Sequence, residues 1–152
     1  MAAEPGFAAL GAPQRDGRTL VVIPRNCIGC RTCEVACSFA HAEAGHGGGQ
    51  LGHSRIRVHA IAPQRFVQVT CLQCANAACV KVCPVQALVR NPATAAIEVD
   101  EQRCIGCSLC RAACPFGHMH FDRARSLAVK CDLCQGQPAC AKFCPNRALE
   151  MR

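Results

Sequence analysis

The 152-residue sequence contains no tryptophan and no tyrosine, and it has only six phenylalanines. Large apolar side chains supply most of the core volume in domains of this size. Their scarcity excludes an interior packed around aromatic rings. It also predicts that something other than ordinary side chains fills the middle of the fold.

Long hydrophobic runs and export signals are missing too. No stretch approaches the roughly 18 apolar residues that a membrane-spanning helix needs. Residues 1–22 contain neither a basic segment followed by an apolar run nor a pair of adjacent arginines. We therefore expect no membrane insertion and a cytoplasmic location, where thiols stay reduced.

The familiar catalytic patterns are also absent. The sequence holds no Ser/His/Asp set, no paired carboxylates and no phosphate-binding loop. Gly47, Gly49 and Gly52 fit the pattern G-x-G-x-x-G, but a dinucleotide site needs a strand before it and a helix after it. Here a group of cysteines precedes the glycines, and a strand-like segment, residues 53–61, follows them. We therefore expect no nucleotide site and no catalysis by this chain alone.

Cysteine is what the sequence has in abundance, with 16 residues in four groups of four. Quartets I and III share the spacing C-x2-C-x2-C-x3-C, while quartets II and IV have a longer gap between the second and third cysteine. The quartets are, in order, CIGCRTCEVAC (27–37), CLQCANAACVKVC (71–83), CIGCSLCRAAC (104–114) and CDLCQGQPACAKFC (131–144). Quartet III repeats quartet I, and the surroundings of quartet IV repeat those of quartet II. The chain therefore consists of two half-repeats, at about residues 20–90 and 97–150.

This density of cysteine in a chain expected to stay reduced favours metal binding over disulfides. The spacing of quartet III, with a proline after it, is typical of the bacterial ferredoxin run for [4Fe–4S] clusters. Three cysteines hold one cluster, and the fourth, on a short helix, ligates a neighbouring cluster. Four quartets then predict four [4Fe–4S] clusters with no cysteine left over. Zinc is the alternative, although zinc sites usually take two cysteine pairs separated by a longer loop.

The basic surplus of the chain matches this prediction. Seventeen Lys and Arg against ten Asp and Glu give a formal charge of +7, which alone would suggest nucleic-acid binding. Four oxidised clusters with thiolate ligands would contribute about −8, at about −2 each. The surplus then balances the clusters, and we expect no nucleic-acid partner.

The sequence between the quartets predicts an α+β fold. A strand is expected over residues 20–24, and hairpins over residues 87–100 and 118–131. Short helices and these hairpins would surround the clusters as a tandem, bacterial-ferredoxin-like repeat with pseudo-two-fold symmetry. We expect a flexible arm over residues 1–19 and one four-cluster domain over residues 20–152, with intertwined half-repeats. A Gly-rich insert at residues 41–55 should form a surface loop.

The four quartets resemble those of the ferredoxin-like, four-cluster electron-transfer subunits of multi-subunit redox enzymes, over about residues 20–150. The resemblance implies that quartet I pairs with IV and quartet II with III, each supplying its fourth cysteine to its partner. Spacing alone leaves the pairing of I with II and III with IV open. The implied ligand sets for the four clusters are, in order, Cys27, Cys30, Cys33 and Cys144; Cys131, Cys134, Cys140 and Cys37; Cys71, Cys74, Cys79 and Cys114; and Cys104, Cys107, Cys110 and Cys83.

The resemblance implies an electron relay between a catalytic oxidoreductase subunit and a second redox subunit or carrier. Within this family, the chain most resembles the compact cytoplasmic members. These accompany tungsten aldehyde oxidoreductases, benzoyl-CoA reductases, carbon monoxide dehydrogenases and hydrogenases. We expect the tungsten aldehyde oxidoreductase type, so the partner would be a tungsten- or molybdenum-pterin enzyme or another metalloenzyme. The alternatives are a free polyferredoxin carrier and a zinc-stabilised interaction module. A relay with two ends would also allow self-association into arrays.

Two pairs of residues are equivalent in the repeat. His41 and His118 each lie four residues after the last cysteine of their quartets. They would either hydrogen-bond near a cluster or, as we favour, serve a surface or packing role. Phe39 and Phe116 are expected to pack over a cluster. The remaining histidines are expected to be solvated: His46, His53, His59 and His120.

Overall fold

The computed structural model describes residues 19–42 and 51–152. The other residues hold nearly all of the predicted N-terminal arm, the centre of the predicted Gly-rich insert, and His46. These predictions therefore lie outside the described residues.

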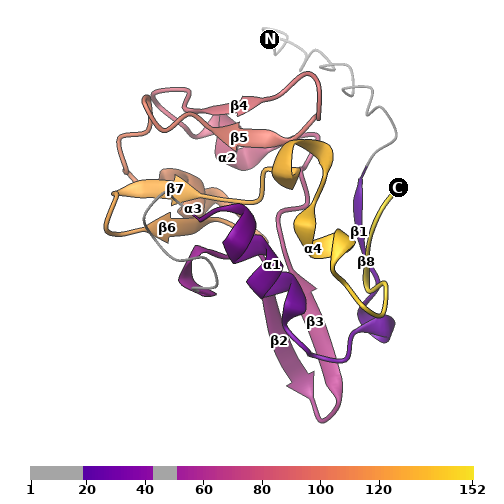
Figure 1. The fold of residues 1–152 in the computed structure, drawn as a ribbon. Helices are drawn as coiled ribbons and strands as arrows, with labels where there is room; N and C mark the ends of the chain where they lie inside the picture. The colour runs from indigo at the N-terminus through magenta and orange to yellow at the C-terminus, as the bar shows by residue number, and fades with distance from the viewer. Residues whose placement is uncertain (1–18, 43–50) are drawn as a thin grey trace, which may run out of the picture.

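The described chain forms short helices and antiparallel pairs of strands (Figure 1). The strand pairs are β1 (Leu20–Val22) with β8 (Leu149–Met151), β2 (Arg57–Ala62) with β3 (Arg65–Val69), β4 (Leu88–Arg90) with β5 (Ile97–Val99), and β6 (His120–Asp122) with β7 (Leu127–Val129). The α-helices are α1 (Thr32–Ala40), α2 (Ala78–Lys81), α3 (Leu109–Ala113) and α4 (Ala139–Lys142). Single 3₁₀ turns are η1 (Pro24–Asn26), η2 (Leu51–His53) and η3 (Leu133–Gly136). The α+β fold and the predicted strand and two hairpins are confirmed.

One strand was missed by the sequence analysis. The segment 53–61 was expected to be extended, and β2 covers most of it. Its partner β3 was not predicted, because its five residues run straight into quartet II without a Gly or Asn turn before them. The turn between the strands instead uses Gln64 at φ 57°, and the register shifts between Ala60 and Ala62.

The first and last strands, β1 and β8, meet in one part of the fold, and the middle of the chain forms the other. β1 pairs with β8 in the register Val22 to Leu149, and α1 packs against α4 beside this pair (Figure 1). In the middle of the chain, α2 packs against α3. Quartet I therefore lies beside quartet IV, and quartet II beside quartet III.

Cysteines make up much of each small core. In the first core, Cys33, Cys37 and Cys140 are buried with Ile56, Val58 and Leu149. In the second, Cys110 is buried with Leu88, Ile97 and Met119, and further cysteines pack around it. Such cores have little apolar volume of their own, as the scarcity of large side chains predicts.

The helices are placed differently from the prediction. The third cysteine of every quartet lies within a helix, as Cys33 does in α1 and Cys140 in α4. The fourth cysteine was expected on the helix, but only Cys37 of quartet I lies there. In the other three quartets the helix has only four or five residues and ends before the fourth cysteine.

Quartets I and III enter their helices through the same turn. Gly29 and Gly106 have φ of 73° and 68°, and the residues just before the helices, Arg31 and Ser108, have φ of 59° and 60°. A Cβ at Gly29 would approach the Phe66 ring to 2.6 Å, and one at Gly106 would overlap the Ser126 carbonyl oxygen. Both the backbone angle and the close neighbour therefore require glycine at these two positions.

Within residues 19–42 and 51–152, no helix combines the length and the apolar character needed to cross a bilayer.

Candidate metal centres

Three hollows in the structure are each lined by four cysteines. In each, three cysteines come from one quartet and the other is the fourth cysteine of the neighbouring quartet. The three hollows share this pattern of lining, as expected if each accommodates the same group. The cysteines of the three hollows are Cys27, Cys30, Cys33 and Cys144; Cys71, Cys74, Cys79 and Cys114; and Cys104, Cys107, Cys110 and Cys83.

The remaining four cysteines also lie together. Burial raises the pKa of Cys140, and the neighbouring thiols of Cys131, Cys37 and Cys134, together with Cys33 of the adjoining first group, raise it further. Only thiols that lie close to one another interact in this way. The structure thus brings all 16 cysteines together in four groups, each with three members from one quartet and one from its neighbour.

Backbone amides point at the fourth cysteines. The N–H groups of Arg55, Ala87 and Ala148 donate to the sulfurs of Cys37, Cys83 and Cys144, each at 3.2 Å. Donors directed at sulfur stabilise a thiolate, which is the form that ligates metal.

Burial works against ionisation of the third cysteines in the absence of a bound cation. It raises the pKa of Cys33 to about 12, with a further contribution from the Glu34 carboxylate. It also raises the pKa values of Cys79 and Cys110. Buried thiols with raised pKa values are poor free nucleophiles, and metal binding displaces their protons. The groups therefore suit metal ligation better than thiol catalysis.

Two buried polar groups show that these sites fit an anionic, sulfur-rich centre. Lys130 is 2% exposed, and the hydrogen bonds of its ammonium go to neutral oxygens, not to a carboxylate. The Thr70 hydroxyl, beside Cys71 in the sequence, is buried without a hydrogen-bond partner among the described residues. A buried cation and an unused donor next to the cysteines are satisfied by a negatively charged iron–sulfur cluster.

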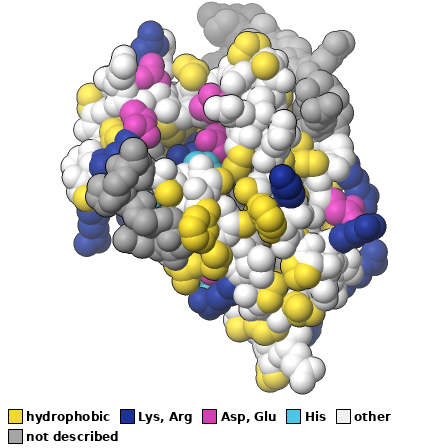
Figure 2. All heavy atoms as spheres, viewed as in Figure 1, with side chains coloured by type: hydrophobic (Ala, Val, Ile, Leu, Met, Phe, Trp, Pro, Cys, Tyr) yellow, Lys and Arg dark blue, Asp and Glu magenta, His cyan; other side chains and the backbone are white. Residues whose placement is uncertain are grey.

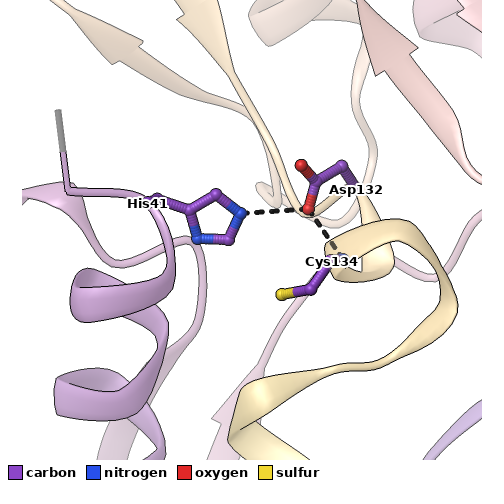
Figure 3. A group of neighbouring side chains, drawn as sticks. All are labelled: His41, Asp132 and Cys134. Atoms are coloured by element: carbon purple, nitrogen blue, oxygen red, sulfur yellow. Dashed lines mark hydrogen bonds and ion pairs between the residues drawn. The ribbon is translucent and has the colours of Figure 1, made fainter. Parts of the chain in front are cut away.

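A charged network adjoins the cysteines of quartets I and IV (Figure 3). The Nε2 of His41, at the end of α1, donates to Asp132 at 3.1 Å, and its Nδ1 lies 2.9 Å from the Cys37 carbonyl and 3.6 Å from the Cys37 sulfur. Arg55 donates to the other Asp132 oxygen at 2.7 Å. The Cys134 N–H also donates to Asp132. Because both ring nitrogens of His41 face acceptors, the ring is a doubly protonated cation.

The pKa values agree with this geometry. Burial alone would lower the pKa of His41, but hydrogen bonds to Asp132, Cys134 and Cys37 outweigh it and raise the pKa to about 12. Burial alone would raise the pKa of Asp132, but His41 and Arg55 hold it well below its usual range. His41, Asp132 and Cys134 lie close enough together to hold a metal ion by themselves, but Cys134 already belongs to a cysteine group.

The network exists in only one part of the fold. Leu72 occupies the repeat position of Asp132, so His118 has no acidic counterpart there. The His118 ring stacks on Phe116 at 5.7 Å, and burial lowers its pKa. The packing role that we favoured thus describes His118 but not His41, which contacts the Cys37 sulfur.

Two of the remaining expectations were wrong. Phe39 is 61% exposed and lines an apolar groove between α1 and α4 together with Val35 and Phe143. Figure 2 shows hydrophobic side chains gathered on this face. His53 and His120 are half-buried rather than solvated. His59 is exposed, as predicted.

Three residues at the sites were not predicted from the sequence. Asp132 contacts His41 from 91 positions away in the chain, and Arg55 binds the other oxygen of the same carboxylate. Lys130 was hidden in the apolar run LAVKC. Comparison of the two half-repeats could have identified Asp132 and Lys130, because Leu72 and Thr70 stand at the equivalent positions of the other half. No such signal marks Arg55.

Comparison with known families and proteins agrees with this arrangement. Residues 63–152 match the family model of a 4Fe-4S dicluster domain, and residues 24–40 match that of a 4Fe-4S binding domain. The chain is 39% identical over 130 residues to the polyferredoxin-like subunit of aliphatic sulfonate oxidoreductase from Pyrococcus furiosus. That alignment covers 82% of this chain and 70% of the relative.

A second relative and a solved structure extend the likeness. The chain is 38% identical over 142 residues to the thiosulfate reductase electron transfer subunit PhsB of Salmonella typhi, covering 83% of this chain and 70% of the relative. Its fold is similar to a chain of the active site complex BamBC of benzoyl coenzyme A reductase, with a TM-score of 0.51 and 26% identity. That match covers 89% of this chain and 76% of the other. With more than half of its length matched by the dicluster model, the chain belongs to the 4Fe-4S dicluster family and binds multiple [4Fe–4S] clusters.

Proposed function

We propose that this chain relays electrons through four [4Fe–4S] clusters as a non-catalytic subunit of an oxidoreductase complex. The observation that carries the proposal is the gathering of the 16 cysteines into four groups of four. The two relatives named above are electron-transfer or polyferredoxin-like subunits of oxidoreductases, which supports the same role. When bound, the clusters supply one-electron chemistry, and the chain supplies their ligands, charge and burial.

The proposed ligand sets follow the four groups. The first cluster takes three cysteines of quartet I, the second three of quartet IV, the third three of quartet II and the fourth three of quartet III. Each set is completed by the fourth cysteine of the paired quartet. In cluster order, the sets are Cys27, Cys30, Cys33 and Cys144; Cys131, Cys134, Cys140 and Cys37; Cys71, Cys74, Cys79 and Cys114; and Cys104, Cys107, Cys110 and Cys83.

Burial supports the order first, second, third, fourth along the relay. Cys30 of the first set and Cys107 of the fourth are the exposed cysteines of the chain. Cys131 of the second set is buried and packs against Cys71 of the third, so these two sets adjoin. The middle of the relay thus lies at the junction of the two parts of the fold, and its ends lie at the surface.

The two ends are where we propose that redox partners approach. Ile28, next to the first set, is 57% exposed, and Ile105, its equivalent next to the fourth set, is 63% exposed. An apolar side chain beside an exposed cysteine lets a partner exclude water close to the ligand. One partner would be the catalytic subunit, and the other a second redox subunit or carrier.

The finer identity of the catalytic partner is also a proposal. The sulfonate oxidoreductase and benzoyl coenzyme A reductase neighbours support an oxidoreductase subunit as the partner. The tungsten- or molybdenum-pterin enzyme of the aldehyde oxidoreductase type rests on the sequence resemblance. The proposed cytoplasmic location rests on the sequence as well.

Anaerobic purification of the tagged chain from its native source tests the function. We expect roughly 16 iron atoms per chain and a stoichiometric large catalytic protein that reduces or oxidises the clusters on addition of its substrate. Tightly bound zinc without broad visible absorption would overturn the cluster assignment. A loaded chain that purifies alone would overturn the subunit role and support a free polyferredoxin.

A further inference from the structure

Lys130 is the only Lys or Arg side chain among the described residues that is buried. It lies between the end of β7 and Cys131, the first cysteine of quartet IV. It also lines the hollow of Cys71, Cys74 and Cys79. The side chain therefore sits where the second and third cysteine sets adjoin.

Three oxygen acceptors surround the side-chain nitrogen of Lys130. Its Nζ donates to the carbonyl oxygens of Ile97 and Cys131, the latter at 2.7 Å, and to the Gln73 amide oxygen at 3.3 Å. An ammonium has three N–H donors, and these acceptors match them one for one. The amide of Gln73 is itself held in place, because it donates to the Cys131 carbonyl at 2.8 Å and accepts from the Ile97 N–H at 2.9 Å.

None of these acceptors carries a charge that could balance the ammonium. A buried and unpaired charge is strongly destabilising, so a buried cation needs a nearby anion. Cysteines of both sets are the candidates, because Lys130 precedes Cys131 in the sequence and lines the hollow of Cys71, Cys74 and Cys79. Burial raises the pKa values of Cys131 and Cys79, and the charge of Lys130 acts against that rise at both thiols.

We propose that Lys130 is a positioning residue whose buried charge stabilises the reduced state of both central clusters, the second and the third. The inference rests on the proposed function, because it needs clusters in both cysteine sets. Each cluster becomes more negative on reduction, and a cation fixed between two of them favours the added electron on either one. Thr70 stands at the position equivalent to Lys130 in the other half-repeat. Only quartet IV therefore has a lysine directly before its first cysteine.

The experiment compares reduction potentials of the full chain, purified anaerobically with its iron. Each potential is followed by electron paramagnetic resonance at poised potentials. Lys130→Met removes the charge, and Gln73→Glu places a carboxylate against the ammonium. We expect each variant to shift two of the four reduction steps to lower potential, with the iron content unchanged. Arg65→Gln is the control, because it removes one charge from an exposed arginine at the start of β3, outside the second and third cysteine sets, and it should leave all four steps in place.

Each result decides between this role and a structural one. If Lys130 has only a structural role, Lys130→Met should lower the guanidinium midpoint of unfolding without moving any reduction step. That result overturns the proposal. An equal shift in Arg65→Gln overturns it as well, because the effect would then not depend on where the charge lies. If Lys130→Met takes up no iron, the iron-loaded Gln73→Glu variant decides the question. Reduction steps that are unchanged in that variant overturn the proposal. Failure of the proposed function is seen separately, as low iron and fewer than four steps in the unmodified chain.

Discussion

At the scale of single residues, the glycines of the two CIGC turns, Gly29 and Gly106, have neighbours of different kinds. Gly106 combines a positive φ with a backbone carbonyl where a Cβ would lie, whereas the neighbour of Gly29 is the end of a Phe66 ring. A ring can move aside more cheaply than a backbone. Equivalent glycines therefore differ in their tolerance to substitution.

Gly106→Ala should lower the free energy of unfolding by about 1–3 kcal/mol, because a strained φ adds to the overlap. Gly117→Ala is the matched control, since Gly117 also has a positive φ but open space around its Cα. That change should cost no more than about 1–2 kcal/mol. Guanidinium unfolding of the loaded protein, followed by visible absorption, measures both. Equal losses would contradict the role assigned to Ser126.

Asp132 is the second position at this scale. It accepts hydrogen bonds from His41, Arg55 and the Cys134 N–H. Asp132→Ala should cost about 1–3 kcal/mol, because it leaves two cations and an amide unsatisfied. Leu72 is the exposed residue at the equivalent position of the other half-repeat, and Leu72→Ala should change the free energy of unfolding by no more than about 0.5 kcal/mol. The same unfolding experiment compares the two, and a neutral Asp132→Ala would show that the network contributes nothing to stability.

At the scale of elements, the β1–β8 pair and the α1–α4 contact hold together the part of the fold that contains quartets I and IV. Leu149 on β8 is 2% exposed and packs in the core of Cys33 and Cys140. Leu149→Ala should lower stability by about 2–5 kcal/mol through the cavity it leaves. It should also release iron from the first and second sites before the others. Met151→Ala, on the same strand but half-buried, is the control, and uniform iron loss across all sites would contradict this division.

The sequence predicted those elements whose signals are local. The hairpins at β4–β5 and β6–β7 have turn residues such as Asn91-Pro92 between apolar runs, and the cysteine spacing marks each quartet. The contacts of His41 with Asp132 were not predictable, because they depend on how α1 meets quartet IV. Lys130 was overlooked because its flanking residues indicate a strand, and only the fold reveals that its side chain turns inward.

At the scale of the whole molecule, the pairing of the quartets is the feature that a mutation series can test. If quartet IV completes the site of quartet I, Cys144→Ser and Cys30→Ser should alter the same paramagnetic signal. Cys83→Ser should then alter the signal that Cys107→Ser alters. In the alternative pairing of I with II, Cys83→Ser would share its effect with Cys30→Ser. Spectra of the four loaded variants distinguish the two arrangements.

The meeting of β1 with β8 also sets the order in which the molecule can be completed during translation. Quartets II and III are neighbours along the chain, so their part of the fold can close first. With the proposed ligand sets, the site of quartet I is completed by Cys144, which emerges 107 positions after Cys37 (144 minus 37). Until then the thiols of quartet I remain open to oxygen and stray metal ions. Under that proposal, iron delivery to the part of the fold that holds quartets I and IV is a late event, after nearly all of residues 1–152 have left the ribosome.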